Sequence, residues 1–155
     1  MATCLLRALH KKLPTKDKLL ALGIISQKSC PFCQQQPESI SHLFFECDYS
    51  AYIWSVCKLK LCLGQQGGNL EEDIKTLHTK FKAKAKCTAI ARHTLAVSVW
   101  HNWKERNLKI FKNKMTDKLQ RLALIKQDVT QLVQHNSWEQ DEDPCMREVI
   151  QNWNC

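Results

Sequence analysis

Apolar residues recur at steps of three and four along the second half of the chain. This spacing predicts one long amphipathic helix, carried by Ala89, His93, Ala96, Trp100, Trp103, Asn107 and Ile110. The same spacing predicts a further helix, which Thr116 could cap, through Leu119, Leu122, Ile125, Val129 and Leu132. An antiparallel helix pair would bury both apolar stripes.

The first third of the chain has shorter elements. Residues 13–23 predict a short helix, with Thr15 as its N-cap, Asp17 in its first turn and Gly23 after its end. Another helix is expected from Asp48, whose carboxylate is the candidate N-cap. Its apolar side would be formed by Tyr49, Ile53, Trp54, Val56 and Cys57.

Four residues between positions 30 and 47 have the types and spacing of a zinc site. Cys30, Cys33, His42 and Cys47 follow the pattern C-x2-C-x8-H-x4-C. Three thiolates and one imidazole complete a tetrahedral zinc shell. A catalytic zinc would keep a position open for water, and this set leaves none. The motif therefore predicts one structural Zn²⁺.

The spacing of the last two ligands limits the local structure. On one regular helix, His42 and Cys47 would be rotated by about 140° from each other. We therefore expect His42 on a short helical turn and Cys47 just before the helix that begins near Asp48. The turn between Cys30 and Cys33 should point backbone N–H groups at the sulfur atoms, which favours the thiolates that zinc requires.

The remaining cysteines and histidines show no comparable pattern. The chain has nine cysteines, an odd number, with no signal-peptide features at its start. A reducing intracellular location, nucleus or cytoplasm, is expected rather than secretion. Buried or incidental thiols are the favoured interpretation of Cys4, Cys57, Cys62, Cys87, Cys145 and Cys155. No Cys–His nucleophile or acid–base pair emerges, so an enzyme is not expected.

Charge is distributed unevenly along the chain. The net charge of +8 divides into +4 for residues 1–63, +8 for 64–135 and −4 for 136–155. Basic segments suit the phosphates of RNA or DNA, but they also suit solvated helix faces on which an acidic tail folds back. Candidate nucleic-acid contacts are Lys16, Lys18, Lys28, Lys104, Arg106, Lys109, Lys112 and Lys114. Trp100, Trp103 and Phe111 are possible stacking surfaces, although core packing is favoured for them.

The order of the motifs suggests a family. Leu-Pro-Thr-Lys-Asp-Lys-Leu at 13–19 is followed by Cys-Pro-Phe-Cys at 30–33, Glu-Ser-Ile-Ser-His-Leu-Phe-Phe-Glu-Cys at 38–47 and Ile-Trp at 53–54. This order resembles the reverse-transcriptase zinc-binding domain at the C-terminal end of plant LINE-type (non-LTR) retrotransposon polyproteins, over roughly residues 1–63. The run Trp-His-Asn-Trp-Lys-Glu-Arg-Asn-Leu-Lys-Ile-Phe at 100–111 is similar to the helix that commonly follows that domain.

The resemblance implies zinc on the same four residues. The family's domain normally opens with an aromatic-rich segment joined to the polymerase, whereas this chain opens with Met-Ala-Thr-Cys-Leu-Leu. A fragment of an element, or a separate short reading frame, would look like this. Neither the paired-aspartate motif of a polymerase nor the carboxylate set of a nuclease is present, so those activities are not implied.

These patterns predict a mainly α fold. A small zinc-stapled helical module (1–63) would precede a linker (64–80), a basic antiparallel helix pair (81–135) and a flexible acidic C-terminal tail (136–155), whose end could form a last turn with Val149, Ile150 and Trp153 inward. The expected function is a non-enzymatic zinc module that contacts RNA or DNA, with no membrane and no small-molecule substrate. The alternatives are a structural module whose helix pair binds a protein, or a non-functional retroelement relic.

Overall fold

The computed structural model describes residues 1–64, 70–82 and 84–154, and over these it is mainly helical. Seven α-helices are joined by loops and one π-turn, with no named strand in the described ranges. The elements are α1 (Ala2–Leu9), α2 (Lys16–Ala21), the π-turn η1 (His42–Glu46), α3 (Asp48–Lys60), α4 (Leu70–Phe81), α5 (Ala85–Lys112), α6 (Lys118–His135) and α7 (Pro144–Asn154).

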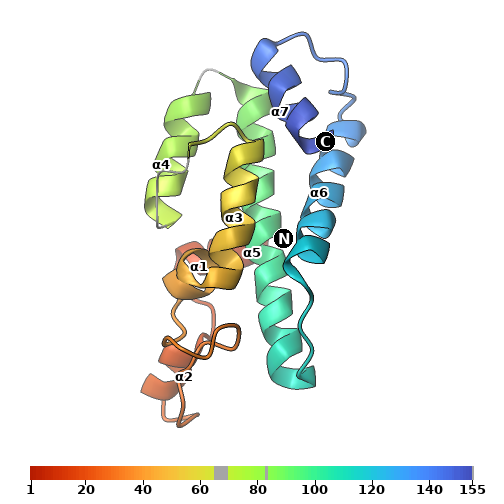
Figure 1. Cartoon of the computed structure of the whole chain (residues 1–155). Coiled ribbons are helices and arrows are strands. Elements are labelled where there is room, and N and C mark those ends of the chain that lie inside the picture. The colour runs from red at the N-terminus through yellow and green to blue at the C-terminus, as the bar shows by residue number, and fades with distance from the viewer. Residues whose placement is uncertain (65–69, 83, 155) are drawn as a thin grey trace.

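The long helix α5 is the axis of the molecule. α6 runs antiparallel beside it, and α1, α3, α4, α7 and η1 also contact it (Figure 1). α5 ends at Lys112, and the left-handed conformation of its C-cap, Asn113 (φ 50°), turns the chain back toward α6. The predicted antiparallel helix pair is therefore present.

The start and the buried face of α6 differ in detail from the prediction. Asp117, not Thr116, is the N-cap, because its carboxylate accepts hydrogen bonds from the backbone N–H groups of Leu119 and Gln120. The buried positions are Arg121, Ile125, Val129 and Val133. Leu119 is 66% exposed, because the inward line of side chains begins at Arg121, which pairs with the buried Glu105 of α5.

The segment predicted as a linker contains a helix. α4 occupies Leu70–Phe81, and the glycine-rich residues 65–69 lie outside the described residues. Asp73 attaches α4 to α3, since it accepts a hydrogen bond from Trp54 Nε1 at 2.6 Å and pairs with Lys58 Nζ at 3.5 Å. Leu77 and Phe81 are buried as well. An apolar and ionic attachment of this kind explains why the segment from residue 70 is helical.

The C-terminal segment, predicted as a flexible tail, ends in the docked helix α7. Val149, Ile150 and Trp153 are buried as the pattern predicted, together with Met146. The acidic stretch before α7 is also engaged. Asp143 Oδ1 accepts hydrogen bonds from the backbone N–H groups of Cys145 and Met146, and Asp141 pairs with Lys86. Asp143 thus caps α7, and Asp141 contacts the basic start of α5. These contacts order the predicted tail.

Apolar side chains from the predicted zinc module, from the helix pair and from α7 belong to one buried cluster. Phe44, Ile53 and Trp54 belong to the same cluster as Ile90, Ile125 and Trp153. Small modules bury too little apolar surface to be stable alone, so a shared core favours both. Among the described residues, none of the helices is both long and apolar enough for a bilayer span.

Candidate metal centre

The first two cysteines lie on a closed turn. Backbone hydrogen bonds join Cys30 N–H to the Gln36 carbonyl (2.7 Å) and Gln34 N–H to the Cys30 carbonyl (2.9 Å). An isolated bridge between Ser29 and Pro37 closes the base of the loop. Gln34 takes a left-handed conformation (φ 59°), which completes the turn. Backbone N–H groups of Phe32 and Cys33 point at the Cys30 sulfur, as predicted.

The other two residues lie at the two ends of η1. The Cys47 N–H donates to the His42 carbonyl at 2.8 Å, a bond across five residues that is typical of a π-turn. The wider turn places His42 and Cys47 on the same side of the chain, which a regular helix would not do. Cys47 immediately precedes α3 and is its N-cap position, so Asp48 is the first helical residue and not the cap.

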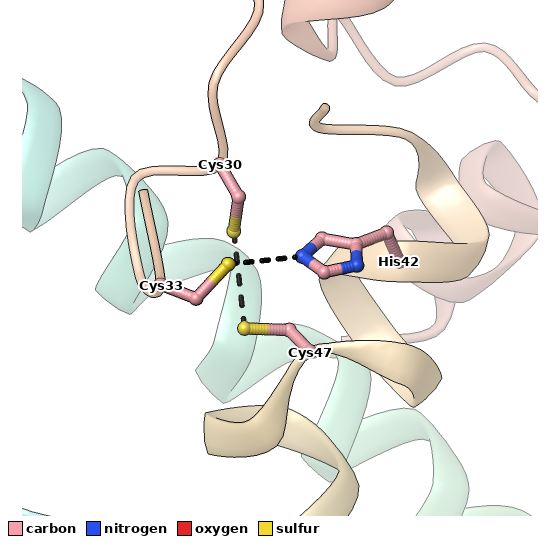
Figure 2. Close-up of side chains that lie close together, drawn as sticks. All are labelled: Cys30, Cys33, His42 and Cys47. Carbon is pink, nitrogen blue, oxygen red and sulfur yellow. Dashed lines mark hydrogen bonds between the residues drawn. The ribbon is translucent and has the colours of Figure 1, made fainter. Parts of the chain in front are cut away.

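The four side chains converge on one point (Figure 2). Their ligand atoms all lie within 4.8 Å of one another. The Sγ atoms of Cys30 and Cys47 are 3.8 Å apart, and Cys33 Sγ is 3.4 Å from His42 Nε2. A tetrahedral zinc shell has S–S edges of about 3.8 Å and S–N edges of about 3.6 Å, given bonds of about 2.3 and 2.05 Å. The donor set therefore fits zinc in type and in spacing.

Burial and hydrogen bonding set the state of the thiols. Cys30 and Cys47 are completely buried. The pKa of Cys30 is raised because its thiol donates to Cys47 and because burial disfavours a charged sulfur. The pKa of Cys47 is lowered because its sulfur accepts that bond, with help from the Tyr49 N–H. Of these two sulfurs, that of Cys47 therefore loses its proton more readily.

Glu38, in the loop between the ligand pairs, is a residue that the sequence reasoning did not single out. Its carboxylate is 0% exposed and accepts two hydrogen bonds from Arg106, Nε to Oε1 at 2.8 Å and Nη2 to Oε2 at 3.1 Å. It also accepts the Lys16 N–H at 2.8 Å and so caps α2. The predicted cap, Thr15, makes no side-chain capping bond.

The structure corrects one of the nucleic-acid candidates. Arg106 is 4% exposed, and its guanidinium is committed to Glu38, Asn107 and the Pro14 carbonyl. These bonds use four of the five N–H groups of a buried guanidinium, so a phosphate in solvent has little access to Arg106. The role of Arg106 is to join α5 to the loop of the metal centre.

The remaining basic candidates fall into two places. Near the metal centre, Lys16 Nζ donates to the Ser29 carbonyl, the Lys18 ammonium is buried, and Lys28 is exposed. On α5 and the loop after it, Lys104, Lys112 and Lys114 are exposed and Lys109 is half-buried.

The three aromatic candidates also differ. Trp100 and Trp103 are half-buried and lie beneath the cationic groups of Lys104 (5.8 Å to the ring centroid) and Arg106 (4.8 Å). Phe111 is 78% exposed. The two tryptophans therefore pack only partly into the core. Of the three aromatic candidates, Phe111 is the one available for stacking.

Comparison with known proteins agrees with the metal centre. Residues 1–54 match the family model described as zinc-binding in reverse transcriptase, and all four ligand candidates lie inside the matched segment. The resemblance to that zinc-binding domain is thereby confirmed for this part of the chain. No curated protein and no solved structure matches the chain. The matched segment and the Cys₃His cluster together fit a zinc-binding module within a mainly helical protein.

A polar network at the turn between α5 and α6 was also missed. Glu105 accepts hydrogen bonds from the backbone and hydroxyl of Thr116 and pairs with Arg121, which also donates to His101 Nδ1 at 3.2 Å. The signal was present in the sequence, since Arg121 lies four residues before Ile125, on the apolar stripe. A charged residue at a buried position indicates a buried partner.

Proposed function

We propose that Cys30, Cys33, His42 and Cys47 hold one structural Zn²⁺ and that the module belongs to a reverse-transcriptase polyprotein of a plant LINE-type element. The observation that carries the zinc assignment is the tetrahedral spacing of the four ligand atoms. Bound zinc would act as a cross-link between the Cys30–Cys33 turn and η1. With four protein ligands, the site leaves no position for substrate, and the proposed role is non-enzymatic.

The proposed activity of the module is contact with the phosphates of RNA or DNA. The basic region proposed for this contact is here called the α5 tip and consists of Lys109, Phe111, Lys112 and Lys114. Lys112, Lys114 and Phe111 are exposed, and Lys109 Nζ bonds only to the Asn113 side chain among the described contacts. Lysines beside an exposed aromatic ring combine phosphate contacts with base stacking, the arrangement typical of single-strand binding. Lys28 and Lys104, also exposed, extend the basic surface.

Binding of a mixed-sequence 20-nucleotide RNA and of the matching DNA, followed by fluorescence anisotropy at several salt concentrations, tests this proposal. We expect the K109A/K112A/K114A variant to bind more weakly and to reduce the slope of log K against log salt by about 2 for a single strand. The matched control is K12A/K75A/K82A, which removes three exposed lysines elsewhere. If both triple variants bound nucleic acid equally weakly, the effect would come from net charge alone. That result would contradict the α5 tip as the binding region.

A protein partner is the second proposed function, and one observation favours it. Large apolar side chains are exposed at the same end of α5 and the start of α6: Ile110, Phe111, Met115 and Leu119. A protein contact through them would resist salt, whereas a phosphate contact would weaken steeply as salt rises. Nucleic-acid affinity that does not change with salt, or no nucleic-acid binding at low salt, would favour the protein partner. Either partner would be met in the nucleus or cytoplasm, where thiols stay reduced.

A further inference from the structure

A second pair of cysteines lies at the opposite end of the molecule from α2. Cys87 lies in the first turn of α5 and Cys145 in the first turn of α7. The Cys87 thiol donates to the Cys145 sulfur at 3.1 Å, a closer approach than the 3.8 Å between Cys30 and Cys47. The two residues are 58 positions apart, so the contact results from the docking of α7.

The two sulfur atoms have different surroundings. Cys87 is 1% exposed, and burial, together with the bond to Cys145, raises its pKa to about 12. Cys145 is half-buried. The Lys84 ammonium acts against the rise in the Cys87 pKa, because a nearby positive charge favours a thiolate. Cys145 is therefore the sulfur that a reagent from solution reaches first.

A metal is a poorer occupant for this cluster than for the first one. Asp143 is the third possible ligand within 4.8 Å. Its Oδ1 already caps α7 through two backbone N–H groups and lies 3.4 Å from Lys84 Nζ. Three donors, one of them engaged and next to a cation, make a weak divalent-cation site. Two sulfurs in contact make a dithiol.

We propose that Cys87 and Cys145 form a reversible intramolecular disulfide that attaches α7 covalently to α5. The oxidant is a low-molecular-weight disulfide, RSSR. The Cys145 thiolate attacks one sulfur of RSSR, which forms a mixed disulfide and releases RS⁻. Cys87 then loses its proton and attacks the Cys145 sulfur, which releases the second RS⁻. The protein loses two protons and two electrons, and RSSR is reduced to two RSH.

The bond would have a structural consequence. A disulfide is about 2.05 Å long, so the two sulfurs must approach by about 1 Å. The bond would close a loop that contains most of α5 and all of α6. It would restrict the release of α7, which covers the shared core with Met146 and Trp153.

The test uses the zinc-loaded full chain, incubated with oxidised or with reduced glutathione. Intact mass spectrometry and peptide mapping should show the loss of two hydrogen atoms and a Cys87–Cys145 link, reversed by reduced glutathione. The oxidised protein should unfold several degrees higher than the reduced one. In C87S, the oxidation should stop at a glutathione adduct on Cys145. C62S is the matched control, since Cys62 is another half-buried thiol near α7, and it should still form the link.

Three results would overturn the proposal. One is a wild-type protein that stops at the glutathione adduct, and another is a link that joins Cys62 to Cys145 instead. The third is a second zinc, seen by native mass spectrometry in the wild type and lost in C87S, which would make the cluster a metal site.

Discussion

Arg106 and Glu38 form a two-pronged ion pair that is buried between α5 and the loop of the metal centre, although 68 residues separate them in the chain. Glu38 lies between Cys33 and His42, and it also caps α2. This pair therefore links three features: the long helix, the short helix and the loop that presents the metal ligands. It also explains why Arg106 is unavailable for nucleic acid.

Replacement of Arg106 by alanine should destabilise the protein strongly. The change leaves the Glu38 carboxylate buried without its charged partner, and such losses lower the free energy of unfolding by about 3–5 kcal/mol. Urea unfolding of R106A measures the effect. R92A, an exposed arginine on the same helix, is the control and should change stability little. If the free energy of unfolding fell no more in R106A than in R92A, the role assigned to the Arg106–Glu38 pair would be contradicted.

Asp73 should hold α4 against α3. D73A removes the acceptor of Trp54 Nε1 and one partner of Lys58, and both of these side chains are buried, so the expected cost is about 1–3 kcal/mol. Hydrogen exchange should accelerate in α4 more than in α5 or α6. The exposed neighbour Glu71 gives the control variant E71A, which should leave exchange in α4 unchanged. Equal exchange rates in α4 for D73A and wild type would contradict the attachment.

His101 should make stability depend on pH. Arg121 donates to its Nδ1, so the neutral ring carries its proton on Nε2 and donates to Asp128 Oδ2 at 2.7 Å. Burial lowers the His101 pKa below its ordinary value near 6.5; Asp128 opposes this, and Arg121 and Lys104 add to it. The unfolded chain then binds more protons than the folded one between the lowered pKa and about 6.5, so stability rises with pH in that window.

The measurement is the urea midpoint at about pH 7.5 and about pH 5.5, with zinc content checked at each. H101Q should lose less stability than the wild type on acidification. H78Q, which removes an exposed histidine of α4, should behave as the wild type does. Parallel pH profiles for H101Q and the wild type would contradict the burial of a neutral imidazole.

Metal removal should act locally. Zinc binding in comparable small sites contributes on the order of 10 kcal/mol, and bound zinc would join the Cys30–Cys33 turn directly to η1. A chelator should therefore abolish hydrogen-exchange protection from the Cys30–Cys33 turn through η1, while α5 and α6, which pack along each other, keep theirs. Full protection of η1 after metal loss would contradict a structural metal. Complete loss of protection in α6 would mean that the shared core depends on the metal throughout.

Short-range patterns accounted for much of the fold. The ligand spacing between Cys30 and Cys47 is local, and the π-turn agrees with the prediction that His42 and Cys47 do not share a regular helix. The periodicity of residues 89–132 predicted α5 and α6 because each needs one long buried face. These signals are contained within single elements, where sequence spacing translates directly into geometry.

Long-range partners were not accessible to the same reasoning. Nothing local to Arg106 indicates that Glu38 is its partner, so it was grouped with the exposed lysines. α4 was missed because its attachment depends on Asp73 meeting Trp54 in another helix. Cys87 and Cys145 follow no ligand spacing, and their contact exists only because α7 docks on α5. Tertiary packing decided each of these cases.

Native mass spectrometry of the wild type, C47S and C62S, with and without chelator, tests the central claim most directly. The four-ligand site predicts one zinc per chain in the wild type and in C62S, its loss together with compactness on chelation, and no stoichiometric zinc in C47S. A folded wild type without zinc, or one tightly held zinc in C47S, would contradict the ligand set of Cys30, Cys33, His42 and Cys47.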